Sequence, residues 1–227
     1  MIVYVSDPIP AVDNIEFGCL CSLAKCNCIG ESGKTLVDIG LTYAQAQTIP
    51  LKRYMSLINA AVKHGETYAI VPDVFCNPEK TVTSYRRYAK AIRQRGAKTV
   101  LVLQRFYESL DVYRDVLHEA DVVALPAHRH CDVSCVSKPR LCAERISHAL
   151  APLAKEMKLC VHLLGPTVRT LRALNPVLRD ICSFDTTSYR WAPTQQVADE
   201  LGGKRLAVSR EMARRWLLQW LKKAGVI

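Results

Sequence analysis

Two aspartates, each at the end of a short apolar segment, are the residues of this chain best placed to do chemistry. Asp73 ends the run Tyr68-Ala-Ile-Val-Pro-Asp73, and Asp185 ends the run Ile181-Cys-Ser-Phe-Asp185. A carboxylate can act as a nucleophile or as a general acid or base. Two carboxylates that come from separate strands suggest that each has its own part in one reaction. The alternative is that each aspartate only caps the helix that follows it, because aspartate is a favoured N-cap residue.

Short apolar segments that recur along the chain supply the strands that would position these groups. They are Ile2–Val5, Leu36–Ile39, Tyr68–Val71, Thr99–Leu103, Val122–Leu125, Leu159–Leu164, Ile181–Phe184 and Arg205–Val208. Each is rich in β-branched residues and lacks polar alternation, which is typical of strands buried on both faces of a parallel sheet. Helical periodicity fills most of the intervals, at residues 52–64, 81–95, 110–119, 139–157, 167–174 and 211–224.

Eight strands alternating with helices predict an α/β fold, a (β/α)₈ TIM-like barrel formed by a single domain over residues 1–227. An open, doubly wound sheet is the alternative. The interval between the first two predicted strands holds no periodic helix, so we expect the barrel to be irregular there, with a cysteine-rich loop at about residues 8–35. Proline at position 152 is expected to kink the helix predicted over 139–157.

A barrel of this kind gathers its functional residues at the C-terminal ends of its strands. The residues at those positions are therefore candidates for substrate binding, and they are Gln104, Pro126, His162, Gly165 and Thr186. His162 could equally be a core histidine whose hydrogen bonds are satisfied within the protein.

Ten cysteines are many for a cytosolic protein. Cys19, Cys21, Cys26 and Cys28 form a C-x-C-x4-C-x-C cluster, and four thiolates suit Zn²⁺ or an iron–sulfur cluster. The spacing differs from the usual C-x2-C pattern, so disulfides or a plain cysteine-rich loop are the alternatives. A looser group contains His128, His130, Cys131, Cys135 and Cys142. We expect Cys76, Cys160 and Cys182, which lie in or beside apolar segments, to pack as small apolar side chains.

The overall charge favours polyanionic partners. Lysine and arginine total 31 against 21 acidic residues, a net charge of +10, which favours nucleic acid, although solvated helix faces would also use many of these residues.

No apolar run approaches the roughly 18 residues of a membrane span, and the start of the chain lacks a basic signal-peptide region. We therefore expect a cytoplasmic protein with no membrane partner. The segment Gly30-Glu-Ser-Gly33-Lys34-Thr35 resembles part of a phosphate loop, but Cys28 stands where that motif needs its first glycine.

Taken in order, the strand ends resemble the tRNA-guanine transglycosylase superfamily, and most closely its short DNA-modifying relatives, the DNA-guanine transglycosylase-like proteins. The similar segments are Val71-Pro-Asp-Val-Phe75 with Thr81 beyond it, Val100-Leu-Val-Leu-Gln104, Val122-Val-Ala-Leu-Pro126, Arg140-Leu-Cys-Ala-Glu-Arg145-Ile, Val161-His-Leu-Leu-Gly165 and Ser183-Phe-Asp-Thr-Thr-Ser188. The similarity covers about residues 68–192, and it rests on the order and spacing of these segments, none of which is specific alone.

The resemblance implies a (β/α)₈ barrel that exchanges guanine in a nucleic acid for a 7-deazaguanine base. Asp185 matches the nucleophile that attacks C1′ of the sugar and forms a covalent intermediate. Asp73 matches the aspartate that acts as general acid and base, Gln104 matches a residue that reads the base edge, and Gly165 lies where a loop backs the base pocket. A purine must leave the base stack before it can react, so a pocket and a cationic surface are both expected.

One departure from the family changes the expected substrate. The tRNA enzymes carry a zinc site of three cysteines and a histidine after the nucleophile, whereas this chain has neither residue type after Asp185. The absence of that site, and the short chain without an appended RNA-binding domain, favour DNA, or a free nucleoside-like substrate, over tRNA. The alternative functions are a hydrolase that cleaves an N-glycosidic bond, a non-catalytic nucleic-acid-binding barrel, and a metal-dependent redox protein built on the N-terminal cysteines.

Overall fold

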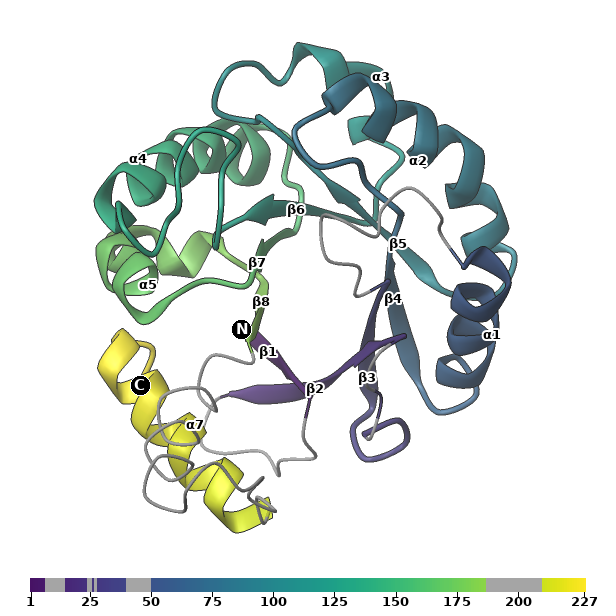
Figure 1. Ribbon diagram of the computed structural model, residues 1–227, viewed down its shortest axis with the longest axis horizontal. Helices are drawn as coiled ribbons and strands as arrows, with labels where there is room; N and C mark the ends of the chain where they lie inside the picture. The colour runs from purple at the N-terminus through teal and green to yellow at the C-terminus, as the bar shows by residue number, and fades with distance from the viewer. Residues whose placement is uncertain (7–14, 24–25, 27, 40–49, 187–209) are drawn as a thin grey trace, which may run out of the picture.

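The computed structural model describes residues 1–6, 15–23, 26, 28–39, 50–186 and 210–227. Eight parallel strands follow one another in chain order around a closed barrel, and β1 pairs with both β2 and β8 (Figure 1). The strands are β1 (Ile2–Val5), β2 (Glu16–Ser22), β3 (Lys34–Asp38), β4 (Glu66–Ile70), β5 (Lys98–Val102), β6 (Val122–Pro126), β7 (Val161–Leu164) and β8 (Ser183–Thr186). The predicted (β/α)₈ barrel is confirmed.

Helices surround the barrel on the outside (Figure 1). They are α1 (Leu51–Ala61), α2 (Pro78–Arg93), α3 (Arg114–Leu117), α4 (Pro139–Leu150), α5 (Val168–Leu174) and α7 (Arg210–Ala224), with 3-10 turns at η1 (Asp111–Tyr113) and η3 (Asn175–Asp180). The predicted disturbance at Pro152 takes the form of a π-helical segment, η2 (Ala151–Glu156), that continues α4. Proline cannot donate an α-helical hydrogen bond, and a π-helical turn is one way for the chain to pass it.

Each strand is buried on both faces because the barrel has an inner and an outer core. Successive side chains of a strand point to opposite faces. One set fills the interior, and it contains Tyr4, Leu36, Ile70, Val100, Val102, Val122 and Ala124. The alternate set packs against the helices, as Phe184 of β8 does against Trp220 of α7 with ring centroids 6.1 Å apart. This double burial is the reason for the uninterrupted apolar segments.

The largest correction to the predicted elements lies in the cysteine-rich segment, where a loop was expected over residues 8–35. Residues 16–22 instead form strand β2. Glycine, two cysteines and a serine conceal it in the sequence, because these residues give a weak strand signal. Gly18 is needed there, since a Cβ atom at this position would lie 2.4 Å from the ring of Tyr4. The predicted strand Arg205–Val208 lies outside the described residues.

The cysteine cluster covers β2 where other strands have a helix. Leu20 faces the barrel interior, so its neighbours Cys19 and Cys21 face outward, and they form disulfides with Cys28 and Cys26 respectively. The buried cysteines pack against Leu57 of α1. A cysteine in a disulfide offers no thiolate to a metal. The predicted metal ligands thus lie together, but the structure joins them in pairs.

Two further disulfides bring the total to four, and they correct the prediction for Cys76. That residue was expected to be a small packed apolar side chain, but it forms a disulfide with Cys131, 55 residues later. Cys135 and Cys142 form the fourth disulfide. Cys160 and Cys182 remain free thiols, and Cys160 packs against the inner core as predicted, whereas the packing of Cys182 stays a prediction.

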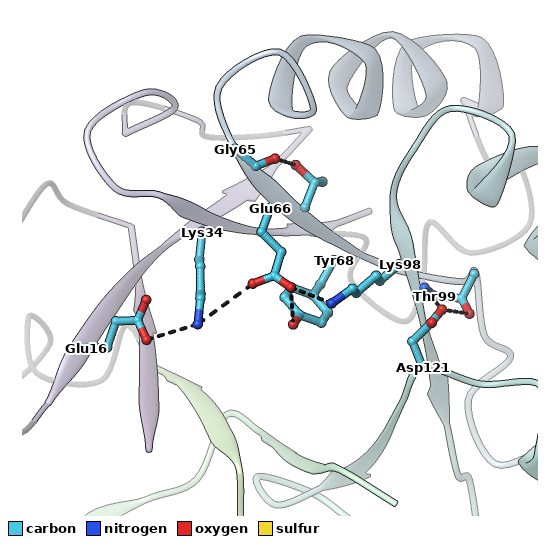
Figure 2. Close-up of polar contacts among 9 residues, drawn as sticks. Glu16, Lys34, Gly65, Glu66, Tyr68, Lys98, Thr99 and Asp121 are labelled. Atoms are coloured by element: carbon cyan, nitrogen blue, oxygen red, sulfur yellow. Dashed lines mark hydrogen bonds and ion pairs between the residues drawn. The ribbon is translucent and has the colours of Figure 1, made fainter.

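The N-terminal rim of the barrel contains a ladder of ion pairs (Figure 2). Lys34 lies 3.0 Å from Glu16 and 3.7 Å from Glu66, and Lys98 lies 2.5 Å from Glu66. Each of these residues is the first of its strand. Lys34 therefore belongs to the rim opposite the strand ends that carry Asp73 and Asp185. In the part of the chain that the structure describes, no helix is long and apolar enough to cross a membrane.

Candidate active site

Asp73 and Asp185 line the same cavity at the C-terminal rim of the barrel. The cavity has a volume of about 280 Å³ and is lined by Asp38, Ile39, Ile70, Pro72, Asp73, Phe75, Val102, Gln104, Pro126, His128, Arg129, Leu164, Gly165 and Asp185. This volume is just below the roughly 300–1,000 Å³ typical of small-molecule sites. Strands β4 and β8 are four positions apart in the ring of eight, so the two aspartates enter the cavity from opposite walls.

Hydrogen bonds within the β4–α2 connection hold the loop that carries Asp73. Asn77 caps α2 by accepting a hydrogen bond from the backbone N–H of Lys80 (2.9 Å), and Pro78 begins the helix. The hydroxyl of Thr81 accepts from the N–H of Val74 at 3.0 Å. Asparagine as the cap and proline at the first position are both favourable at a helix start. The loop therefore has a fixed shape, set by the first turn of α2.

Asp73 has a neutral partner. The side-chain amide of Gln104 donates to Oδ2 of Asp73 at 2.6 Å, and the amide oxygen accepts from the backbone N–H of Cys76 at 3.2 Å. The second contact fixes which end of the amide faces the carboxyl group. Burial raises the pKa of Asp73 above its ordinary value, and the hydrogen bond from Gln104 opposes the shift only in part. A raised pKa suits a carboxyl group that must deliver a proton.

Asp185 lies on strand β8 itself, and its side chain points inward because that of Phe184 points outward. Its Oδ1 atom accepts hydrogen bonds from the backbone N–H of Gly165 at 3.0 Å and from Nε2 of His162 at 3.1 Å. Gly165 has a φ of +59°, a left-handed conformation that glycine adopts without strain. This conformation directs the backbone N–H of the β7–α5 turn at the carboxylate.

The predicted substrate-binding residues separate into two groups. Gln104, Pro126 and Gly165 line the cavity. His162 is 1% exposed and contacts Asp185 from within the barrel. Thr186 is fully buried beside Val5 and, by strand alternation, faces away from Asp185. A contact between Thr186 and a substrate stays a prediction.

Other residues of the cavity wall were not predicted as site residues. Asp38 is the last residue of β3, and the strand-end rule would have found it if the predicted strand had stopped one residue earlier. Arg129 and His128 are exposed and come from the β6–α4 connection. The guanidinium of Arg129 lies 5.8 Å from the ring centroid of Phe75. Loop residues such as these give no periodic signal in a sequence.

The loops on this side of the cavity are cross-linked. The Cys76–Cys131 disulfide joins the β4–α2 connection to the β6–α4 connection. Asp132 accepts two hydrogen bonds from Arg145, both at 2.7 Å, and one from the hydroxyl of Tyr107 at 2.9 Å. The bound guanidinium holds the pKa of Asp132 well below its usual range. Three consecutive strand-to-helix loops thus form one wall of the cavity.

Comparison with known proteins adds little to this picture. No protein-family model matches the chain, and no curated protein matches it in sequence. Among solved structures, the carboxyl transferase domain of Rhizobium etli pyruvate carboxylase, determined with pyruvate, is similar at 11% identity with a TM-score of 0.37. The match covers 88% of this chain and 42% of the length of that one.

Proposed function

We propose that this barrel is a base-exchange transglycosylase that replaces guanine in a nucleic acid, DNA in preference to tRNA, with a 7-deazaguanine base. The main support is the pair of carboxyl groups in one cavity with different environments. Asp73 is half-buried against a neutral amide and has a raised pKa, whereas Asp185 accepts hydrogen bonds from Gly165 and His162. Two carboxyl groups in different environments are suited to separate roles in one reaction. The resemblance of the strand ends to the guanine transglycosylases supplies the reaction class.

The reaction needs one carboxyl group in each role. Asp185 attacks C1′ of the nucleotide, the bond from C1′ to the base breaks, and the departing guanine takes a proton from Asp73. The products of this half-reaction are an aspartyl–sugar ester and a free guanine. Asp73, now ionised, takes the N9 proton of the incoming 7-deazaguanine, which attacks C1′ and releases Asp185 as a carboxylate. Protons balance over the cycle, and no metal or redox cofactor takes part.

The wall of the cavity fits a planar, hydrogen-bonding ring. Phe75, Pro126 and Leu164 offer apolar surface, and Gln104 and Asp38 offer polar groups. Arg129 and His128 at the exposed side could contact phosphate oxygens, in keeping with the net charge of +10. A base must leave its stack to reach a cavity of this kind. The lack of cysteine and histidine after Asp185, where the tRNA enzymes bind zinc, is the reason for favouring DNA.

The test is incorporation of a labelled 7-deazaguanine into guanine-containing DNA and tRNA, with denaturing gels to detect a covalent protein–nucleic acid adduct. We expect label in DNA and an adduct with the wild-type protein, and neither with Asp185→Asn. Glu16→Gln, which alters a carboxylate at the opposite rim, is the matched control and should behave as wild type. Release of guanine without incorporation would favour the hydrolase instead. Binding of DNA with neither product would favour a non-catalytic barrel.

The N-terminal cysteines support a separate proposal for a cofactor. We propose that Cys19, Cys21, Cys26 and Cys28 bind Zn²⁺ once a thiol reductant has supplied two electrons to each of their disulfides. The sulfur atoms of Cys19, Cys21 and Cys28 lie within 4.8 Å of one another, close enough to share one ion. Metal analysis after reduction and dialysis against Zn²⁺ should find about one ion per chain, and Cys19→Ser should abolish it. A reduced protein that retains no metal would exclude the site.

A further inference from the structure

A buried pair of side chains lies directly behind Asp185. His162 is 1% exposed and Ser183 is 5% exposed, and the register of β7 and β8 places the two residues side by side. Nδ1 of His162 lies 2.8 Å from the hydroxyl of Ser183, and Nε2 lies 3.1 Å from Oδ1 of Asp185. Both residues point into the barrel with Asp185, because β8 alternates around the outward-facing Phe184 and β7 around the outward-facing Leu163.

The partners of the imidazole decide where its proton lies. An ionised carboxylate can only accept hydrogen bonds, so the contact with Asp185 requires a proton on Nε2 of His162. In a neutral imidazole the other nitrogen is then an acceptor, and the hydroxyl of Ser183 can donate to it. Asp185 thus selects the tautomer of His162, and the hydroxyl of Ser183 donates to the nitrogen that this tautomer leaves as an acceptor.

The interior of the barrel also fixes the plane of the imidazole. The ring of Tyr4 meets that of His162 edge to face, with centroids 5.9 Å apart. Tyr4 is itself confined, because its ring occupies the space that a side chain at position 18 would need. His162 therefore has a packed neighbour on one side and hydrogen bonds at both nitrogens, which leaves its ring no freedom to turn away from Asp185.

We propose that Ser183 and His162 act as a positioning pair for the aspartate nucleophile; this rests on the proposed function. Among the described residues, the hydrogen bonds to Asp185 come from His162 and Gly165, and both reach Oδ1. The carboxylate is thereby fixed in rotation, and Oδ2 is the oxygen that forms the ester with C1′. Oδ1 becomes the carbonyl oxygen of that ester and keeps both donors.

The pair has its largest effect in the second half-reaction. There the bond from C1′ to Oδ2 breaks, its electron pair returns to the carboxylate, and negative charge reappears on Asp185. Donors already aimed at Oδ1 stabilise this charge as it develops. In the first half-reaction the same donors stabilise the attacking carboxylate before reaction, so they contribute there mainly through orientation. Loss of the His162 donor should therefore slow breakdown of the ester more than its formation.

The first experiment needs no enzymatic activity. Long-range ¹H–¹⁵N spectra of the histidine rings, with His162 assigned by its loss in His162→Asn, should show a proton on Nε2 and none on Nδ1 at neutral pH. In Asp185→Asn, whose amide can either donate or accept, this single tautomer should give way to a mixture. A wild-type His162 with its proton on Nδ1, or with both nitrogens protonated, would refute the positioning pair whatever the protein catalyses.

The second experiment uses a matched pair of substitutions. The side-chain nitrogen of glutamine lies as many bonds from Cα as Nε2 of histidine, so His162→Gln can still donate to Asp185, whereas the shorter His162→Asn cannot. We expect His162→Asn to lower turnover about 10- to 100-fold, the effect of one hydrogen bond to a charged group, and to increase the fraction of trapped adduct. His162→Gln should restore most of the turnover.

The two experiments separate failure of this inference from failure of the proposed function. Equal loss in both variants, or a loss in His162→Asn without more adduct, would show a merely structural histidine and overturn the inference. The expected tautomer together with no base exchange by the wild-type protein would support the hydrogen-bonded pair and reject the transglycosylase.

Discussion

Glu66 at the N-terminal rim of the barrel and Asp73 at the C-terminal rim lie in opposite electrostatic environments. At the N-terminal rim, Glu66 is paired with Lys34 and Lys98, and the hydrogen bond from Lys98 is the main reason that its pKa is lowered (Figure 2). At the C-terminal rim, Asp73 receives its hydrogen bond from a neutral amide, and burial raises its pKa. One rim neutralises its acids with cations, whereas the other keeps an acid partly desolvated beside a cavity.

Because of this difference, the carboxylate at one end of the barrel axis is suited to stabilising the fold, and the carboxyl group at the other end is suited to chemistry. A carboxylate paired with lysines has its charge stabilised and is a poor proton donor near neutral pH. A desolvated carboxyl group costs stability when it ionises, and such groups are typical of functional sites. Asp73 follows the C-terminal end of the same strand that Glu66 begins, so the two environments are separated by the length of β4.

The strongest way to break the comparison is to remove the ionisable group at position 73. Asp73→Asn should lower base exchange by about 10²- to 10⁴-fold, the usual contribution of a general acid or base. A labelled-base assay measures this loss, and Asp132→Asn, which alters a carboxylate of the same wall, is the control. Activity near the wild-type level in Asp73→Asn would remove this residue from the mechanism.

The same substitution has an expected effect on stability with a defined sign. A group whose pKa is raised by folding stabilises the folded state at low pH, and the contribution is lost as pH rises through the folded pKa. Folding raises the pKa of Asp73, so this residue behaves in that way. At pH 7 the asparagine variant should therefore be more stable than wild type, by about 1 kcal/mol, the usual gain from relieving a strained site. The advantage should shrink as the pH falls, and denaturant unfolding at pH 4 and pH 7 measures both.

A smaller effect is expected from cutting the cross-link of the active-site wall. Cys76 has a φ of +60°, which is unfavourable for a residue with a side chain, and its N–H orients Gln104. Without the Cys76–Cys131 disulfide the loop can relax, and Gln104 loses the contact that directs its amide to Asp73. We expect the double variant Cys76→Ser, Cys131→Ser to lose about 2–4 kcal/mol of stability and about tenfold in exchange rate.

The Cys135–Cys142 disulfide provides the control for that experiment. It closes a separation of 7 residues, against 55 for Cys76–Cys131, so its removal should cost less stability in the chain-entropy account. Among the described residues, the hydrogen bonds of Gln104 are to Asp73, Cys76 and Tyr113 and not to this disulfide, so its double serine variant should keep the wild-type exchange rate. Equal rate losses in the two double variants would show that the cavity responds to general loosening of the wall.

The barrel and the strand-end aspartates could be predicted because they follow from local patterns. Uninterrupted β-branched segments indicated strands buried on both faces, and the positions of Asp73 and Asp185 relative to those segments placed them at one rim. Strand β2 could not be found in this way. Its outward face is covered by Cys19 and Cys21 with their disulfide partners in place of an amphipathic helix, so the usual periodic signal was missing.

Side-chain pairs between residues far apart in the sequence could not be predicted, for a different reason. Cys76 and Cys131 are brought together by the closed ring of strands, and nothing in the residues around either one indicates the pairing. His162 was predicted to be a substrate-binding residue because it lies near a strand end. Whether it faces a cavity or a neighbouring side chain depends on the register of β7 with β8, which places it beside Ser183. Register is a property of strand pairs and cannot be read from one strand.

The smallest expected effect lies at the N-terminal rim and tests the other half of the comparison. Glu66→Gln removes the carboxylate shared by Lys34 and Lys98. Ion pairs that are partly open to solvent contribute little, so we expect a loss of about 0.5 kcal/mol at pH 7, reduced by high salt. A group whose pKa is lowered by folding stabilises the folded state above its ordinary pKa, so the loss should vanish as the pH falls below about 4. Urea unfolding across this range measures it, with Glu108→Gln of the exposed Arg105 pair as the control. Base exchange should be unchanged, and a marked loss of activity in Glu66→Gln would mean that the two rims are not independent.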